Sequence, residues 1–262
     1  MSLLEVEDLT VEIGGRRVVD GVGFEVAAGG RLGVVGASGS GKTMAALAVL
    51  GLAPRTARVT GAVRLAGEEL LGLRDREASR LRGRRMAMVF QEPLTALNPL
   101  MRVGRQIAEP LRLHRGLGRR AADAAAVEWC ERVGLPDPER TARAYPHQLS
   151  GGQRQRVGIA MAVAAGPALL VADEPTTALD VTVQAGIVDL LRDLAAAHDL
   201  ALVFISHDLA LVHQVCDRLV VMDEGRVVER GAAAEVLTRP EHACTRALVA
   251  SAAAGALPAV EP

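Results

Sequence analysis

Lysine is almost absent from this chain of 262 residues, although basic residues as a class are not. Lys42 is the only lysine among the 30 basic residues, and every other one is arginine. A guanidinium is a broad planar fork, whereas an ammonium is a compact point charge that can reach between the oxygens of a polyphosphate. We therefore interpret Lys42 as a phosphate-binding residue. The alternative is that one lysine remains by chance in a composition biased toward arginine.

Cysteine is also scarce, and neither sign of charge is in excess. The three cysteines, Cys130, Cys216 and Cys244, lack zinc-ligand spacing or a disulfide pattern, which favours a reducing compartment and a role as small hydrophobes. The formal net charge is −1 and the isoelectric point is about 6.6. A protein that binds nucleic acid through a broad basic surface is therefore not expected.

Long apolar runs are missing as well. The longest apolar region, Ile159–Ala172, is interrupted by Gly166-Pro167 and is shorter than a membrane span. The first eight residues carry early acids and no basic segment, so a secretory signal is not expected. The sequence predicts a soluble protein that can dock on an embedded partner.

The order of the predicted elements indicates an α/β fold. Residues 3 to 35 alternate apolar and polar residues, which predicts a small antiparallel face leading into a buried strand over Arg31–Val35. Further buried strands are predicted over Met86–Phe90, Ala168–Asp173, Ala201–Ile205 and Arg218–Met222, separated by helices as in a parallel sheet. A hairpin is predicted at 223–226, and helices over Val103–Arg115, Arg119–Val133 and Gln153–Ala165 predict an inserted helical lobe.

The strongest motif is the segment Gly36-Ala37-Ser38-Gly39-Ser40-Gly41-Lys42-Thr43. It satisfies the phosphate-loop pattern, and it follows a predicted strand and opens a predicted helix. Glycines let backbone N–H groups turn toward phosphates, and the positive end of the helix dipole adds to their attraction. Lys42 is then available to the transferred phosphoryl group and the Thr43 hydroxyl to Mg²⁺. The alternative is a flexible turn that matches the pattern by chance.

Two acids follow the apolar strand that begins at Leu169. Successive strand residues point to opposite sides, so we expect Asp173 to face a magnesium ion and Glu174 to face an attacking water. A polar pair that merely ends a strand is the plain alternative, but the phosphate loop favours the functional interpretation.

A third motif, Ser150-Gly151-Gly152-Gln153, has the spacing of a capping box at the start of a helix. Taken alone it is an ordinary helix cap, although its two glycines permit close approach by a ligand. The full string from Tyr145 to Arg156 is much more specific.

With these motifs the chain resembles the ATP-binding subunits of ABC transporters over nearly its whole length. The resemblance implies an α/β P-loop NTPase with a RecA-like core and parallel sheet, an antiparallel β subdomain and an inserted all-helical subdomain. It implies one nucleotide-binding domain over residues 1–262: a catalytic core with the β subdomain at 1–90 and 167–235, a helical subdomain at 91–166 and a short tail at 236–262.

The resemblance also implies the roles of the motif residues. Gly36–Thr43 is similar to the Walker A loop, Gln91 to the Q-loop glutamine, Ser150–Gln153 to the signature, Asp173 and Glu174 to the Walker B acids, Asp180 to the D-loop aspartate and His207 to the switch histidine. The implied cofactors are ATP and Mg²⁺, with Thr43, Gln91 and Asp173 on the metal. Glu174, His207, Lys42 and Gln91 are the implied catalytic residues.

The implied partners follow from the same family. The signature of one subunit caps the ATP held by the other, in a head-to-tail dimer with an identical or paralogous ATPase. Two transmembrane permease subunits and, indirectly, an extracytoplasmic solute-binding protein complete the implied assembly at the cytoplasmic face of the membrane. No nucleic acid is implied.

The chain departs from the family pattern in its first strands. Family members usually stack adenine on an aromatic residue there, but residues 10–20 contain none, and Ile13 is the expected substitute. Base stacking is then weaker, which affects nucleotide affinity and selectivity.

The string Phe90 to Pro99 resembles the dipeptide, oligopeptide and nickel importer branch, and the tail from Pro240 to Leu248 is similar to a C-terminal motif of that branch. Peptide import is the first expectation, and a nickel or metal-chelate importer is the alternative. A non-transport ABC ATPase and a plain P-loop kinase are rival interpretations. Non-transport ABC ATPases usually carry a second cassette or a long coiled coil, and this sequence has neither. A P-loop kinase does not account for the signature or for Asp180.

Overall fold

The computed structural model describes residues 2–91, 96–177 and 179–255. The chain forms two compact units, which are described separately: Met1–Asp75 together with Ala201–Pro262, and Arg76–Leu200. Within the described ranges no helix combines the length and the apolar character needed to cross a membrane.

An antiparallel sheet opens the first unit. Its strands are β1 (Ser2–Ile13), β2 (Arg16–Ala27), β4 (Ala57–Leu65) and β5 (Glu68–Glu69), in the order β2-β1-β4-β5. The strands β1 and β2 are joined by Gly14 and Gly15, which have φ of 57° and 81° and so allow a tight two-residue turn. The sheet confirms the antiparallel face expected from the alternating pattern.

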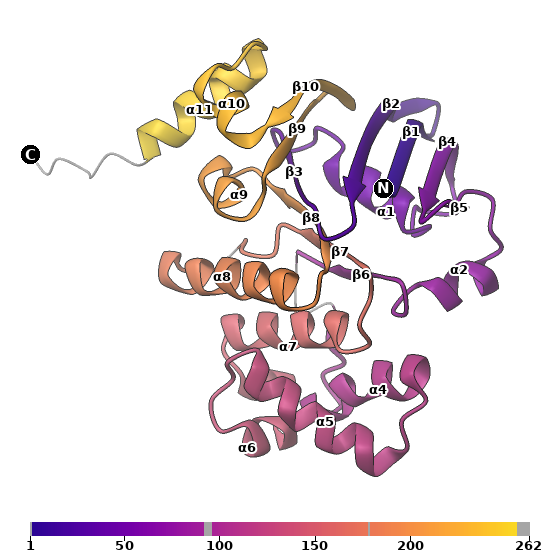
Figure 1. Ribbon diagram of the computed structural model, residues 1–262, viewed down its shortest axis with the longest axis vertical. Coiled ribbons are helices and arrows are strands. Elements are labelled where there is room, and N and C mark those ends of the chain that lie inside the picture. Colours follow the sequence, from indigo (N-terminus) through magenta and orange to yellow (C-terminus); the bar gives the residue numbers. More distant parts are fainter. Residues whose placement is uncertain (1, 92–95, 178, 256–262) are drawn as a thin grey trace, which may run out of the picture. The chain divides into compact units, whose positions relative to one another are not determined.

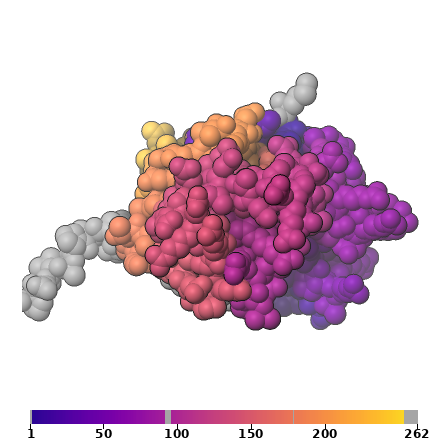
Figure 2. Space-filling model, turned by 90° about the horizontal axis from the view of Figure 1, so that it is seen from below, coloured from indigo at the N-terminus to yellow at the C-terminus, as the bar shows by residue number. Residues whose placement is uncertain are grey.

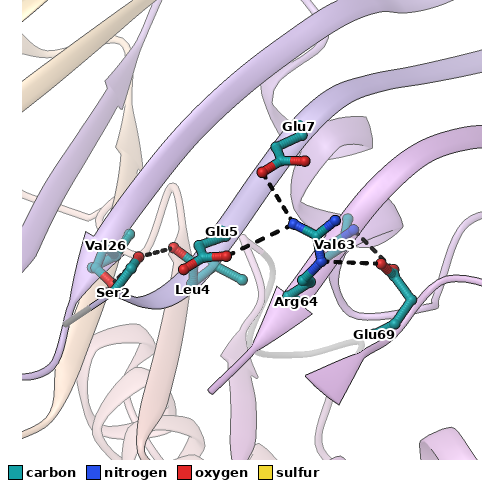
Figure 3. A network of polar contacts seen from close by, with 8 residues as sticks. All are labelled: Ser2, Leu4, Glu5, Glu7, Val26, Val63, Arg64 and Glu69. Atoms are coloured by element: carbon teal, nitrogen blue, oxygen red, sulfur yellow. Dashed lines mark hydrogen bonds and ion pairs between the residues drawn. The ribbon is translucent and has the colours of Figure 1, made fainter. Parts of the chain in front are cut away.

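Arg64 links three strands on the polar side of this sheet (Figure 3). One of its Nη atoms lies 3.0 Å from a carboxylate oxygen of Glu7 and 3.8 Å from one of Glu5, and its Nε lies 3.7 Å from Glu69. The hydrogen bond and charge of Glu7 raise the pKa of Arg64 above its ordinary value. Because these groups are solvent-accessible, the cluster fixes strand register more than it stabilises the fold.

The second sheet region of this unit is mainly parallel. Strand β3 (Arg31–Val35) lies between β8 (Ala201–Ser206) and β9 (Arg218–Asp223), parallel to both, and β10 (Arg226–Ala232) is antiparallel to β9. Gly33 is required in β3, because a Cβ atom there would lie 2.2 Å from Val212 Cγ1 on the adjacent helix. The helices of this unit are α1 (Lys42–Val49), α9 (Leu209–Val215), α10 (Ala233–Thr238) and α11 (Ala243–Gly255).

The other unit contains a parallel strand pair and most of the helices (Figure 1). Strands β6 (Met86–Val89) and β7 (Leu169–Asp173) are parallel, with Val89 opposite Ala172. The helices are α4 (Val103–Arg115), α5 (Arg119–Arg132), α6 (Pro138–Arg143), a 3-10 turn at Pro146–Gln148, α7 (Gly151–Val163) and α8 (Val181–Ala197), and α2 (Asp75–Leu81) begins at the boundary.

The predicted elements are largely confirmed. Strand β3 and helix α4 have the predicted bounds, and the hairpin at 223–226 joins β9 to β10. The short helices α2 and α6 were not predicted, because seven and six residues are too few for a clear helical period. The proposed division into core, helical lobe and tail stays a prediction.

Candidate functional site

The phosphate loop lies between β3 and α1, as the motif predicted. Helix α1 begins at Lys42, after Gly41 with φ of 96°. The Lys42 side chain is only 5% exposed, and its Nζ donates hydrogen bonds to the backbone oxygens of Gly36 at 2.9 Å and Ala37 at 2.8 Å. It also lies 3.4 Å from Ser40 Oγ. The ammonium is therefore held inside the loop, where arriving phosphate oxygens can replace carbonyl oxygens.

Two glycines of the loop are required by packing within the protein. A Cβ atom on Gly36 would lie 2.2 Å from the Met222 backbone oxygen, and one on Gly41 would lie 2.7 Å from the Val18 backbone oxygen. The sequence argument assigned these glycines to phosphate approach. The structure adds that strands β2 and β9 pass too close for any side chain.

The hairpin between β9 and β10 supports the loop, which the sequence did not reveal. The Gly225 N–H donates to the Ser40 backbone oxygen at 3.1 Å, and the Asp20 N–H donates to the Gly225 oxygen at 2.8 Å. Hydrogen bonds from Arg226, and to a lesser extent Arg17, hold the pKa of Asp20 below its ordinary value. From the sequence, this segment was predicted only as a hairpin at 223–226, without a contact to the phosphate loop.

His207 lies on the same edge as the phosphate loop. It directly follows Ser206, which is opposite Val35 in the parallel pair β3 and β8. The Ser206 hydroxyl accepts from the Asp208 N–H at 3.0 Å, and the Asp208 carboxylate caps α9 through the N–H groups of Ala210 and Leu211. This turn leaves the His207 side chain exposed.

Ile13 ends β1, opposite Arg16 of β2 and Ala57 of β4. Its side chain is half-buried in the same unit as the phosphate loop. An apolar side chain at a strand end can cover one face of a base, but it lacks the polarised ring of an aromatic residue.

The second unit brings Gln91 and Glu174 together. The two residues follow the paired positions Val89 and Ala172 by two residues each, and Gln91 Nε2 donates to Glu174 Oε2 at 3.2 Å. The Thr177 hydroxyl donates to the same carboxylate oxygen at 2.9 Å. The sequence predicted Gln91 and Glu174 as site residues but did not identify Thr177 as a partner.

The expectation that Asp173 and Glu174 alternate along one strand is wrong. Strand β7 ends at Asp173, which is 2% exposed, and Glu174 has φ of 45° in a turn. The two acids are therefore separated by a change of backbone conformation and not by strand alternation. Asp173 is fixed in the strand end, whereas the Glu174 side chain is half-buried.

The capping box at Ser150 is confirmed. The Ser150 hydroxyl accepts from the Gln153 N–H at 3.3 Å, and Gln153 Oε1 accepts from the Ser150 N–H at 2.9 Å. Packing requires a glycine at position 152, whether or not a ligand approaches it, because a Cβ atom there would lie 2.5 Å from Val183 Cγ1. The start of α7 is thus a rigid, exposed turn pressed against the start of α8.

Asp180 precedes α8 and is exposed, with its backbone oxygen accepting from the Gln184 N–H at 2.9 Å. Gln184 also donates through Nε2 to the backbone oxygens of Thr176 at 3.2 Å and Leu179 at 3.0 Å. It therefore positions the segment that carries Asp180. The sequence did not predict this positioning role of Gln184, because a single glutamine inside a predicted helix matches no motif.

The predicted metal ligands are all oxygen donors, which suits Mg²⁺. Among the described residues there is no cluster of three or more His, Cys, Asp or Glu side chains able to hold a metal ion. In nucleotide sites Mg²⁺ needs only one or two protein ligands, because phosphates and waters supply the others. Thr43, Gln91 and Asp173 each offer an oxygen donor of the kind that Mg²⁺ takes, and their assignment to one ion stays a prediction.

Residues 19–177 match the family model described as ABC transporter. This chain belongs to the ABC transporter family. The dipeptide transport ATP-binding protein DppD of Haemophilus influenzae is 45% identical over 96% of this chain and 78% of that protein. The oligopeptide transport ATP-binding protein OppD of Bacillus subtilis is 45% identical over 95% of this chain and 71% of that protein.

Solved structures agree with the family. A dimeric post-hydrolysis state of the ATP-binding cassette MJ0796, bound to ADP and Pi, is similar with a TM-score of 0.77 and 28% identity, covering 88% of this chain and 98% of that chain. CbiO1 of Clostridium perfringens, part of the transporter complex cbiONQ, gives a TM-score of 0.77 at 24% identity. The ABC protein described here has the P-loop NTPase fold and is an ATP-binding, ATP-hydrolysing transporter subunit.

Proposed function

We propose that this ABC ATPase energises the import of dipeptides or oligopeptides through permease subunits. The observation that carries the cargo assignment is the high identity, over most of both chains, to dipeptide and oligopeptide transport ATP-binding proteins. The residues of its phosphate loop and of the Glu174 turn support the ATPase step.

The phosphate loop binds the triphosphate. Lys42 exchanges its bonds to the Gly36 and Ala37 carbonyls for bonds to the γ-phosphate, which costs little because its ammonium is already desolvated and oriented. The backbone N–H groups from Gly36 to Thr43 bind the other phosphate oxygens. Ile13 covers the adenine in place of an aromatic ring.

Glu174 acts as the general base for the attacking water. Its carboxylate is oriented by the Thr177 hydroxyl at 2.9 Å and the Gln91 amide at 3.2 Å, which both donate to Oε2. His207 contacts the γ-phosphate from the end of β8. We assign Mg²⁺ coordination to Thr43, Gln91 and Asp173; the ion, when bound, neutralises phosphate charge.

The signature completes a second subunit's site. The exposed helix start at Ser150, with Gly151, Gly152 and Gln153, presents N–H groups and the positive end of the α7 dipole to a γ-phosphate. Asp180, next to it in the neighbouring turn, lies at the same interface. An identical or paralogous ATPase supplies the partner site, in a head-to-tail dimer closed by ATP.

Two transmembrane permease subunits and an extracytoplasmic solute-binding protein complete the proposed importer, with this chain bound at the cytoplasmic face of the membrane. We also propose that residues 1–90 and 167–235 form the catalytic core, that 91–166 form the helical subdomain and that 236–262 form the tail.

The decisive ATPase experiment uses Glu174→Gln, which keeps the side-chain shape and removes the base. With Mg-ATP, light scattering is expected to show a dimer that persists, because hydrolysis no longer opens it. Glu174→Gln combined with Lys42→Ala is the matched control and is expected to stay monomeric. A mass for Glu174→Gln that does not change with Mg-ATP contradicts a dimer of two identical subunits, and the same measurement on a mixture with the paralogous ATPase tests the other form of the dimer.

The cargo is tested separately. The protein is co-purified with the permease subunits encoded beside it and reconstituted, and uptake of a labelled dipeptide and of Ni²⁺ is measured. ATP-dependent dipeptide uptake that is lost in Glu174→Gln supports the proposal. Uptake of Ni²⁺ without dipeptide uptake overturns the peptide assignment and leaves the ATPase assignment intact.

A further inference from the structure

A groove of about 950 Å³ lies among helices α4, α5 and α6. These helices belong to the magenta and pink part of the chain, whose surface is seen in Figure 2. Five arginines line the groove: Arg102, Arg105, Arg112, Arg119 and Arg143. None of the proposed ATPase residues lines it.

The arginines are brought together by helical spacing. Arg105, Ala108 and Arg112 are three and four residues apart and therefore lie on one face of α4. Arg119 and Asp123 are four residues apart on α5, and both line the groove. The cationic groups thus come from three separate segments of the chain.

Small residues form part of the groove lining. A Cβ atom on Gly104 would lie 2.8 Å from the Ala142 Cβ, so α4 and α6 approach each other more closely than larger residues would allow. Ala108 and Ala124 also line the groove. Gly104 and Ala108 are buried, whereas the five arginines are exposed, so the charged groups of the lining lie toward solvent.

The groove is electrostatically unbalanced. Five arginines face two acids, Asp123 and Glu139, in a chain whose formal net charge is −1. Within the described part of the chain, no ion pair is formed by any of the five arginines. Arg102 instead lies over the Tyr145 ring, with its Cζ 5.9 Å from the centroid.

Two helix N-termini contribute positive backbone charge to this groove. Helices α4 and α5 both begin at this groove, with Arg102 as the N-cap of α4 and Arg119 as the first residue of α5. Neither helix has a side-chain cap or an acid in its first turn. Their positive dipole ends add to the guanidinium charges of Arg102 and Arg119, whereas Arg112 and Arg143 lie in the last turns of α4 and α6, where the helix dipole is negative.

We propose that this groove binds a ligand carrying two or more phosphate charges. Guanidinium groups form paired N–H···O bonds with phosphate oxygens, and several around one concave volume select multiple charge over single charge. The volume lies within the range of small-molecule sites. The phosphates belong either to a soluble polyphosphate or to anionic lipid headgroups, and this binding is independent of the proposed ATPase function.

The test removes three arginines and compares two phosphate sources. All proteins carry Lys42→Ala, so that the phosphate loop does not contribute. The groove variant adds Arg105→Gln, Arg112→Gln and Arg119→Gln. The control variant adds Arg55→Gln and Arg120→Gln, two exposed arginines that do not line the groove and form no ion pair among the described residues. Calorimetry with inorganic tripolyphosphate measures the soluble source, and sedimentation with phosphatidylglycerol vesicles measures the lipid source.

We expect the parent protein and the control to bind one of the two probes, with affinity that falls as salt is added. The groove variant is expected to bind it about tenfold more weakly, since each exposed charge contact contributes a few-fold. Binding of neither probe, or equal binding by the groove and control variants, overturns the proposal. Circular dichroism melting checks that the variants fold, and single Arg105→Gln and Arg112→Gln variants replace the triple variant if it does not.

Discussion

Val35 and Ser206 are opposite each other on the parallel strands β3 and β8, so the residues that follow them, Gly36 and His207, leave the sheet at the same edge. In parallel sheets this edge, at the carboxyl ends of the strands, is where ligands bind. The register of one strand pair therefore brings together a loop and a histidine that are far apart in the sequence. In the other unit, the register of Val89 and Ala172 does the same for Gln91 and Glu174.

Thr177→Val is expected to slow ATP hydrolysis without weakening ATP binding. The substitution keeps the side-chain shape and removes the hydroxyl that donates to Glu174 Oε2 at 2.9 Å. A hydrogen bond to a charged group contributes about 1.5–3 kcal/mol, so kcat falls about ten- to a hundredfold. Thr177→Ser retains the hydroxyl and is expected to keep most of the activity. A change in KM alone, or equal kcat for the two variants, contradicts this role of Thr177.

Two glycines on α7 are expected to respond in opposite directions to substitution by alanine. Gly152→Ala places a Cβ atom 2.5 Å from Val183 Cγ1, and overpacking of this kind costs about 1–3 kcal/mol. Gly158 has open space around its Cβ position, so Gly158→Ala is expected to raise the free energy of unfolding by about 0.5–1 kcal/mol. Urea unfolding measures both changes.

The contact with Val183 supplies an internal check on this prediction. Val183→Ala combined with Gly152→Ala is expected to be less destabilised than the sum of the two single variants, because the colliding methyl group is gone. Additive effects would show that the cost of Gly152→Ala arises elsewhere.

The start of α11 is expected to loosen in acid. Burial disfavours the charged form of Glu229, but hydrogen bonds from the Glu241 N–H at 3.0 Å and the His242 N–H at 2.9 Å favour it, and the Glu229 pKa lies below its ordinary value of 4.5. A lowered pKa means that this contribution to stability is present above about pH 4.5 and is lost as the pH falls through the lower, folded-state value.

Glu229→Gln removes this pH dependence. The Tm difference between the protein and Glu229→Gln is expected to be present near neutral pH and to shrink as the pH falls below about 4.5. NMR shifts of the Glu241 and His242 amides follow the same transition directly. A Tm difference that is constant with pH would show that Glu229 does not stabilise the tail through its charge.

Two cysteines are expected to resist thiol reagents in the folded protein. Burial raises the pKa of Cys130 to about 11, and burial followed by the charge of Asp217 raises the pKa of Cys216. Both side chains are at most 3% exposed, so thiolate is scarce and access is blocked. Alkylation at mildly alkaline pH, followed by mass spectrometry, is expected to modify them only in denaturant. Rapid modification of the native protein contradicts their placement in the core.

Much of the site was predictable because its signals are local. The strand, glycine loop and helix around Lys42 are contiguous, and the Ser150 capping box needs only four residues. The support of the loop by Gly225 and the bond between Thr177 and Glu174 were not predictable. The first depends on strands from distant parts of the chain, and the second on a turn whose conformation no local pattern specifies.

The amino-acid order alone indicates the class of this protein through a phosphate loop with its single lysine, a capped signature helix, two acids at the end of a buried strand, and the order of α and β segments. These features rest on interactions between near neighbours and on hydrophobic periodicity, which the amino-acid order carries directly. Three relationships became visible in the folded chain alone: Glu174 leaves its strand in a turn, Gly152 packs against Val183, and five arginines from three helical segments share one groove. Strand register and helix packing set these relationships, and both arise from contacts between segments that the sequence keeps far apart.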